Sequence, residues 1–179
     1  MTNKKYIKSI EITNFKNFSQ KTTFEFAQGL NVIVGENGSG KSNLLDCINF
    51  ALGKNFRGDS KSELFNSEIY SDTVTVKLTI NTGDTITKEL KKISNDKIRS
   101  RYFINDKSSL KALITRLSRE IKFEVMDDCA ISLSDEQAQV CAKEIKLKSE
   151  TVQIIVVSNR GEIINIANKI INIAKKGEK

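Results

Sequence analysis

The sequence predicts an α/β fold in which an antiparallel β lobe is inserted into a parallel α/β core. A continuous apolar run at residues 30–34 is typical of a buried parallel strand. Strict alternation of apolar and polar residues at 73–80 is typical of a half-buried antiparallel strand. Between residues 34 and 42 lies a glycine-rich segment, followed by apolar residues at helical spacing.

The remaining elements follow from the same periodicities. Predicted strands, in chain order, are 6–12, 22–26, 30–34, 73–80, 85–90, 102–104, 123–126, 152–157 and 170–174. Predicted helices are 42–52, 107–119, 134–147 and 160–167, the third opening with a capping box of Ser134 and Gln137. We expect residues 1–120 to form an N-terminal lobe with a β-hairpin insertion and 121–179 a C-terminal lobe, together one domain.

The composition narrows the function. A net charge of +7, with basic residues concentrated in 4–21 and 88–101, fits either contact with a polyanion such as DNA or a lysine-rich solvated surface. The absence of histidine excludes every mechanism that needs an imidazole. No apolar run approaches the ~18 residues of a membrane span, so we expect an intracellular protein without membrane contact.

The glycine-rich segment carries the chemistry. Residues 35–42, Gly-Glu-Asn-Gly-Ser-Gly-Lys-Ser, satisfy G-x-x-x-x-G-K-[ST] between a buried strand and a helix. The loop's backbone N–H groups and the helix N-terminus are suited to phosphates. Lys41 would reach phosphate oxygens and Ser42 would bind Mg²⁺. The sequence therefore predicts a nucleoside triphosphate site, for ATP with Mg²⁺.

Residues 6–117 resemble the N-terminal lobe of SMC/RecF-type ATPase heads, the DNA-maintenance branch of the ABC ATPases. The resemblance rests on Ile-x-Ile-x-Asn-Phe-Lys-Asn-Phe at 10–18, on LNVIVGENGSGKSNLLD at 30–46 and on Phe-Ala-Leu-Gly at 50–53. It implies a P-loop NTPase core of the ABC-head type. It also implies that nucleotide is held by Lys16 and by the loop residues Gly35, Glu36, Asn37, Gly38, Ser39, Gly40, Lys41, Ser42 and Asn43. Arg57 would take the place of a family arginine that lies near the nucleotide or DNA.

The C-terminal part resembles the second lobe of these heads. Val-Met-Asp-Asp at 125–128 would be the Walker B strand, with Asp127 orienting Mg²⁺ through water. Asp128 would take the place of the usual glutamate general base, and Lys41 would assist catalysis. Residues 154–159 would lead to the switch position, where Asn159 replaces the usual histidine. Because Asp128 is one methylene shorter and Asn159 cannot carry a proton, we expect hydrolysis to be slow.

Two family features are missing from the sequence. There is no ABC signature motif, since Leu117-Ser118-Arg119-Glu120 echoes it without either glycine. The coiled coil, which the family inserts between its lobes, would fall near 119–123, where the lobes instead join directly. The resemblance therefore implies a weak or partner-dependent ATPase in DNA or chromosome maintenance or repair. It would act as a nucleotide-dependent dimer or with a partner that supplies the signature motif. The alternative is a scaffold or regulatory module that binds nucleotide without hydrolysing it.

Overall fold

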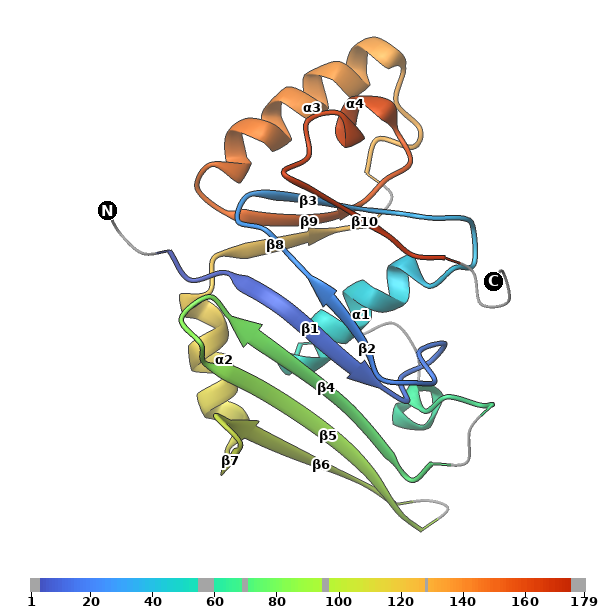
Figure 1. The fold of residues 1–179 in the computed structure, drawn as a ribbon, viewed down its shortest axis with the longest axis vertical. Coiled ribbons are helices and arrows are strands. Elements are labelled where there is room, and N and C mark those ends of the chain that lie inside the picture. The colour runs from blue at the N-terminus through green and yellow to red at the C-terminus, as the bar shows by residue number, and fades with distance from the viewer. Residues whose placement is uncertain (1–3, 55–59, 69–70, 95–96, 128, 175–179) are drawn as a thin grey trace. The chain divides into compact units, whose positions relative to one another are not determined.

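A computed structural model describes residues 4–54, 60–68, 71–94, 97–127 and 129–174. These residues form one four-stranded and one six-stranded sheet (Figure 1), which confirms the predicted α/β class with an antiparallel part. It divides into two compact units. The parallel unit comprises residues 1–7, 26–45 and 122–179, and the antiparallel unit comprises 8–25 and 46–121.

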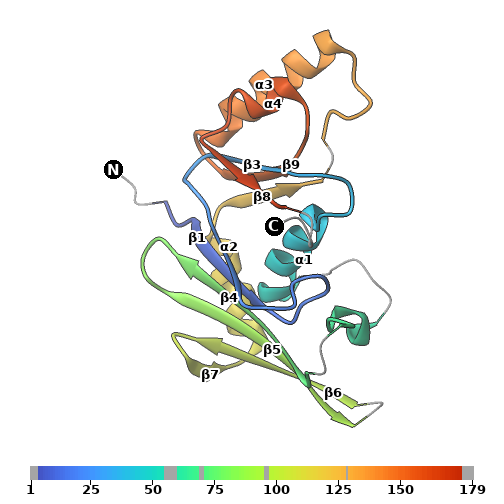
Figure 2. The same cartoon turned by 45° about the vertical axis from the view of Figure 1, so that its right-hand side comes forward.

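The parallel unit is built on a sheet of order β10-β3-β9-β8, in which all neighbouring strands are parallel. Its elements are β3 (Leu30–Val34), β8 (Phe123–Met126), α3 (Asp135–Ser149), β9 (Gln153–Val157), α4 (Gly161–Ile164) and β10 (Lys169–Asn172). Helices α3 and α4 lie together on one face of this sheet (Figure 2). Both inner strands, β3 and β9, therefore have a covered face, as their apolar sequences require.

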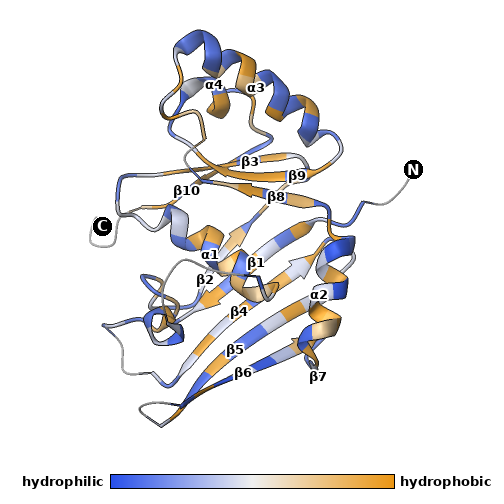
Figure 3. Ribbon diagram, turned by 180° about the vertical axis from the view of Figure 1, so that it is seen from behind, coloured by the Kyte–Doolittle hydropathy of each residue, from blue (hydrophilic) through white to orange (hydrophobic). Residues whose placement is uncertain are grey.

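The core of this unit is a cluster of aliphatic side chains from the inner strands and the two helices. Its buried members are Leu30, Val32, Ala142, Ile145, Ile154, Val156 and Ile163. In Figure 3, β3 and β9 are coloured as nearly unbroken apolar strands. Asn31 is the exception, because it is fully buried within β3. Its amide exchanges two hydrogen bonds with the backbone of Ala27, at 2.7 and 2.9 Å, so burying this polar group leaves its donor and acceptor satisfied.

The predicted capping box starts α3. The Ser134 hydroxyl accepts a hydrogen bond from the backbone N–H of Gln137 at 3.3 Å, and the Gln137 side chain accepts one from the Ser134 N–H at 3.1 Å. These bonds satisfy two donors that a helix start otherwise leaves open. The helix therefore begins at the residue after Ser134.

The antiparallel unit is built on a sheet of order β2-β1-β4-β5-β6-β7. Its elements are β1 (Ile7–Thr13), β2 (Thr22–Glu25), the 3₁₀ turn η1 (Lys61–Leu64), β4 (Thr73–Ile80), β5 (Thr85–Ser94), β6 (Lys97–Ile104), β7 (Lys107–Ser109) and α2 (Lys111–Glu120). The predicted pair β1–β2 is antiparallel, as are β4–β5, β5–β6 and β6–β7. Helix α1 (Lys41–Ala51) begins in the parallel unit and ends in this one.

The predicted helix at 107–119 is wrong at its start, because residues 107–109 form β7 and the helix begins at Lys111. Asn105 and Asp106 both have positive φ, 50° and 60°, and make a two-residue turn that pairs Ile104 with Lys107. Positive φ at both central positions is the geometry of a tight hairpin with the natural strand twist, and Asn and Asp tolerate it. The turn chemistry of these two residues therefore overrides the helical pattern that follows.

Two predicted strands are also longer than expected. β5 extends past residue 90 to Ser94, and β6 begins at Lys97 rather than 102. The added pairs include Lys91 with Arg99 and Lys92 with Ile98. The charged side chains of these pairs are exposed, so the sequence lacks the alternating apolar residues that mark a strand. The backbone is nevertheless extended here because it pairs with the neighbouring strand.

The contacts of β3 set the composition of the parallel unit. β3 pairs with β9 and β10 on its two sides, so residues near 30 group with those after 122. The predicted division of the chain into an N-terminal lobe (1–120) and a C-terminal lobe (121–179) stays a prediction. Between them, α2 ends at Glu120 and β8 begins at Phe123. Among the described residues, no helix is long and apolar enough to cross a membrane.

Candidate nucleotide-binding site

The predicted phosphate loop, residues 35–42, runs from β3 into α1 in the parallel unit. β3 is buried from Leu30 to Ile33, and the loop leaves the sheet at Val34. Helix α1 starts at Lys41, so its first turn follows the loop directly. The N–H groups of a first turn have no carbonyl partner within the helix. This arrangement points partial positive charge at whatever the loop encloses.

Two glycines of the loop are required by its geometry. A methyl group added at Gly35 would lie 2.5 Å from the backbone oxygen of Ile173 and 2.8 Å from the Ser39 hydroxyl. Gly40, immediately before Lys41, has a φ of 104°, which side chains other than hydrogen rarely permit. The motif's outer glycines therefore serve close packing at the start of the loop and backbone reversal at its end.

Lys41 lies inside the loop. Its side chain is buried, with 8% exposure for the residue, and Nζ donates hydrogen bonds to the carbonyl oxygens of Gly35 and Glu36 at 2.8 Å each. A buried ammonium needs such acceptors. It also carries a positive charge that an incoming phosphate can attract away from two neutral carbonyls, since a charge-assisted pair is the stronger bond.

The two predicted metal-binding residues come together in the structure. The Ser42 hydroxyl donates to Oδ1 of Asp127 at 3.1 Å, although the two residues are 85 positions apart in sequence. Ser42 opens α1 and Asp127 follows β8. Hydroxyl and carboxylate oxygens are hard ligands of the kind Mg²⁺ prefers, with water and phosphate oxygens completing its shell. The Ser42–Asp127 pair therefore fits a magnesium ion. Among the described residues, no cluster of three or more Cys, Asp or Glu side chains could hold a metal.

A pocket of about 590 Å³ opens in front of the loop. One wall comes from the loop and the start of α1, and the other from the segments that follow β8 and β9. The lining residues are Asn37, Gly38, Gly40, Lys41, Ser42, Asn43, Cys129, Ile131, Ser158, Asn159 and Arg160. Since β3 and β9 are parallel neighbours, their carboxyl ends share one edge of the sheet, which places both walls together.

The predicted site residues outside the loop differ in how the structure places them. Asn159 lines the pocket, at the predicted switch position. Lys16 belongs to the antiparallel unit, where its Nζ contacts Oδ2 of buried Asp46 at 2.7 Å. Arg57 and Asp128 lie outside the described residues. The nucleotide role of Lys16 and of Arg57 and the catalytic role of Asp128 stay predictions.

Sequence reasoning missed three residues of the pocket, Cys129, Ile131 and Arg160. Arg160 follows β9 by three positions, and its backbone N–H donates to the Ser158 hydroxyl at 3.2 Å. The signal that could have found it is its place just beyond a buried parallel strand next to β3, where ligand-binding side chains gather. For Cys129 and Ile131 no sequence pattern marked the role.

A second cluster of charged groups lies in the antiparallel unit. Lys88 on β5 is 6% exposed, and its Nζ lies 4.0 Å from the ring centroid of Phe50 and 5.3 Å from that of Tyr102. Burial, with the positive charges of Lys111 and then Lys61, lowers the pKa of Lys88 to about 8. These three ammonium groups therefore create a positive potential near the C-terminal end of α1, and Nζ of Lys61 reaches the Ser100 hydroxyl at 3.4 Å.

The fold and this site define the chain as a P-loop domain with the architecture of an ABC-type ATPase head. Residues 6–125 match the family described as the RecF/RecN/SMC N terminal domain, and the chain belongs to that family. It is 37% identical over 105 residues to the chromosome partition protein Smc of Thermoplasma acidophilum, and 47% identical over 66 residues to that of Desulfitobacterium hafniense. The aligned parts are 56% and 35% of this chain but only 9% and 6% of those proteins.

Solved structures agree on the fold. An SMC head bound to the C-terminal winged-helix domain of ScpA superposes with a TM-score of 0.81, over 93% of both chains at 16% identity. A structure from work on the ATP-driven dimerization and DNA-stimulated activation of SMC ATPases has a TM-score of 0.58 at 25% identity, over 65% of this chain and 79% of that one. The recombination mediator RecF with ATP has a TM-score of 0.54 at 26% identity, over 76% and 35%.

Proposed function

We propose that the chain binds ATP with Mg²⁺ in the phosphate-loop pocket and serves as the ATPase head of an SMC/RecF-type protein that acts on DNA. The observation that carries this is the 3.1 Å contact between Ser42 and Asp127 at the mouth of the loop. It joins a hydroxyl from the phosphate-loop motif to a carboxylate from the predicted Walker B strand. Both are needed to hold the metal that accompanies a triphosphate.

The chain's own residues would act as follows. Lys41 exchanges the carbonyls of Gly35 and Glu36 for phosphate oxygens, while the loop's N–H groups and the start of α1 hold the remaining negative charge. Ser42 and Asp127 would hold Mg²⁺, which neutralises phosphate charge when bound. Asp128 would accept the proton of an attacking water, and Asn159 would donate a hydrogen bond at the terminal phosphate.

We propose further that turnover is slow alone and depends on a second protomer or a partner. The sequence has no signature motif, which in the family faces the nucleotide from the opposite protomer. A related structure at 25% identity comes from SMC ATPases that dimerize in an ATP-driven way, which supports a nucleotide-dependent dimer here. A role on chromosomal DNA would place the chain inside the cell.

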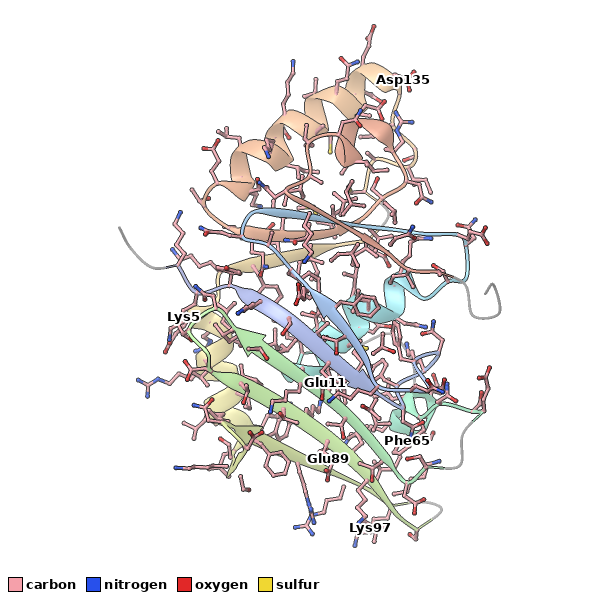
Figure 4. The ribbon with its side chains drawn as sticks, viewed as in Figure 1. Lys5, Glu11, Phe65, Glu89, Lys97 and Asp135 are labelled. Carbon is pink, nitrogen blue, oxygen red and sulfur yellow. The ribbon has the colours of Figure 1, made fainter. Side chains whose placement is uncertain are left out.

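Contact with DNA is supported by the basic groups of the antiparallel unit. Lys61, Lys88 and Lys111 come from three different elements and raise one another's local potential. The β5–β6 hairpin adds exposed Lys91, Arg99 and Lys97, and Figure 4 shows Lys97 at the far end of β6. Such a concentration of cations attracts phosphates without reading sequence.

The test compares ATP binding and turnover, with and without duplex DNA, in the wild type, in Lys41→Ala and in Lys143→Ala. Lys143 is an exposed lysine of α3 and serves as the matched control. We expect Mg²⁺-dependent binding and DNA-stimulated turnover in the wild type and the control, and neither in Lys41→Ala. Tight ATP binding with no turnover, even with DNA, would instead favour a scaffold that binds nucleotide without hydrolysing it. This is the second candidate function, because Asp128 and Asn159 stand where the family has a glutamate and a histidine. No binding at all would refute both.

A further inference from the structure

Arg160 is the second cationic side chain of the nucleotide pocket. Among the residues that line the pocket, Lys41 and Arg160 are the two with positive charge. Lys41 belongs to the loop after β3, and Arg160 to the segment between β9 and α4. Because β3 and β9 are parallel neighbours, the two cations come from adjacent strand ends. A triphosphate bound in this pocket would therefore meet a cation from each of the two walls.

The guanidinium of Arg160 is only partly used by the protein. Nη2 donates to Oδ1 of Asp135 at 3.0 Å and to Oε1 of Glu162 at 3.2 Å. Nε is buried and has no hydrogen-bond acceptor among the described residues. A guanidinium carries five N–H donors, and a buried donor without an acceptor calls for an explanation. A ligand oxygen would reach this donor only if the side chain turned to bring Nε into the pocket, so Nη2, which already pairs with exposed Asp135, is the donor that a ligand meets first.

The carboxylate contacts of Arg160 differ in strength. The side chain of Asp135 is 87% exposed, and it stands at the N-terminal end of α3, as labelled in Figure 4. Ion pairs of such exposed groups contribute little. The Glu162 side chain is 23% exposed, close to the 25% of Arg160 itself, so this second pair is the more protected. The Asp135 contact can therefore be given up at small cost while Glu162 continues to orient the guanidinium.

We infer that Arg160 contacts the terminal phosphate of the bound nucleotide. In the absence of nucleotide, Nη2 of Arg160 donates to Asp135; on binding, phosphate oxygens take the place of the Asp135 carboxylate as the acceptor. Arginine suits this exchange because its planar fork matches two oxygens of one phosphate. The inference rests on the proposed function, since it assumes that the pocket receives a nucleoside triphosphate.

A contact with the terminal phosphate predicts discrimination between nucleotides. ATP has the phosphate that Arg160 would hold and ADP lacks it, whereas Lys41 and the loop serve both. Removing Arg160 should therefore weaken binding of a triphosphate far more than binding of a diphosphate. A purely structural arginine, which only ties α4 to α3 through Glu162 and Asp135, would affect both nucleotides alike.

The experiment measures the Kd of ATPγS and of ADP, each with Mg²⁺, by isothermal titration calorimetry. In Arg160→Gln we expect ATPγS binding to weaken about 10- to 100-fold, as loss of a charge-assisted hydrogen bond implies, and ADP binding to change less than about twofold. Asp135→Asn should raise ATPγS affinity about two- to fivefold, because it removes a competing exposed ion pair. Arg116→Gln, an arginine change on α2 of the antiparallel unit, is the matched control and should change neither.

Several outcomes would overturn the inference. Equal losses for both nucleotides in Arg160→Gln would make Arg160 structural, and unchanged ATPγS affinity would exclude the contact. Arg160→Lys keeps the charge but not the fork, so it guards against a misfolded glutamine variant; it should lie between wild type and Arg160→Gln. If the wild type bound neither nucleotide, the proposed function itself would fail. If Lys41→Ala abolished binding of both nucleotides while Arg160→Gln changed the affinities for ATPγS and ADP equally, only the Arg160 inference would fail.

Discussion

The parallel and antiparallel units distribute their polar groups in opposite ways. In the parallel unit, β9 is buried along its whole length, and the polar residues of the site follow the strands at their carboxyl ends. In the antiparallel unit, β4 alternates between buried and partly exposed residues from end to end. Lysines and arginines recur along the sequences of its strands β5 and β6, and Figure 4 labels one of them, Lys97. The first arrangement concentrates chemistry at one sheet edge, and the second presents a charged surface.

By this contrast, the proposed nucleotide binding belongs to the parallel unit and the proposed DNA contact to the antiparallel unit. The contrast predicts that a substitution in one unit removes one of these functions and leaves the other unchanged.

Lys41→Ala should have the largest effect. It removes the buried ammonium that holds the carbonyls of Gly35 and Glu36 and that would pair with phosphate oxygens. We expect ATP affinity to fall more than about 100-fold, from loss of charge-assisted bonds in a buried site, with DNA affinity unchanged. Calorimetry for ATP and fluorescence anisotropy for DNA measure the two. Retention of wild-type ATP affinity would refute the phosphate-loop assignment.

The reciprocal variant is Lys61→Ala with Lys111→Ala. Both residues are exposed and add positive charge around Lys88. We expect DNA affinity to fall roughly 30-fold and the slope of log K against log salt concentration to decrease by about 2, since each phosphate contact contributes about 0.9. ATP affinity should not change. A DNA affinity equal to wild type would remove these lysines from the DNA surface.

Lys88→Met tests the buried charge beneath that surface. Burial lowers the pKa of Lys88 from 10.5 to about 8, so below pH 8 the folded state holds an ammonium in an unfavourable place. Between about pH 8 and 10.5 the folded protein has lost this proton while the unfolded chain keeps it, so wild-type stability should rise with pH. The rings of Phe50 and Tyr102 attract the ammonium and offset part of the cost.

We therefore expect Lys88→Met to gain roughly 1–2 kcal/mol at pH 7 and to lose the rise between pH 8 and 10.5. Urea unfolding at pH 7 and pH 9.5 measures both. Lys91→Met, an exposed neighbour on the same strand, is the control and should leave the rise in place. A rise of the same size in Lys88→Met would mean that another group titrates.

Ser134→Ala should have the smallest effect and is confined to the parallel unit. It removes the hydroxyl that accepts the Gln137 N–H at the start of α3. Loss of such a cap costs about 0.5–1 kcal/mol. Thermal unfolding should record this loss while DNA affinity stays at the wild-type value. Loss of DNA affinity here would contradict the division of labour between the units.

Much of the fold could be predicted because most elements carry their own local signal. The buried run at β3, the alternation of β4 and the capping box of α3 are each stated within a few residues. The prediction was wrong where two signals competed. At Asn105 and Asp106 the turn outweighed a helical pattern, and in β5 and β6 exposed charges hid strands that pairing keeps extended.

The candidate site divides in the same way. The phosphate loop could be predicted from local sequence, because one short motif contains the glycines, Lys41 and Ser42 within eight positions. Three other features depend on tertiary contacts: Asp127 reaches Ser42, Arg160 lines the same pocket, and Lys61 and Lys111 add to the charge around Lys88. These residues are far apart in the chain, and parallel pairing of β3 with β9 and β9 with β8, not any local pattern, brings the strand ends of the pocket to one edge.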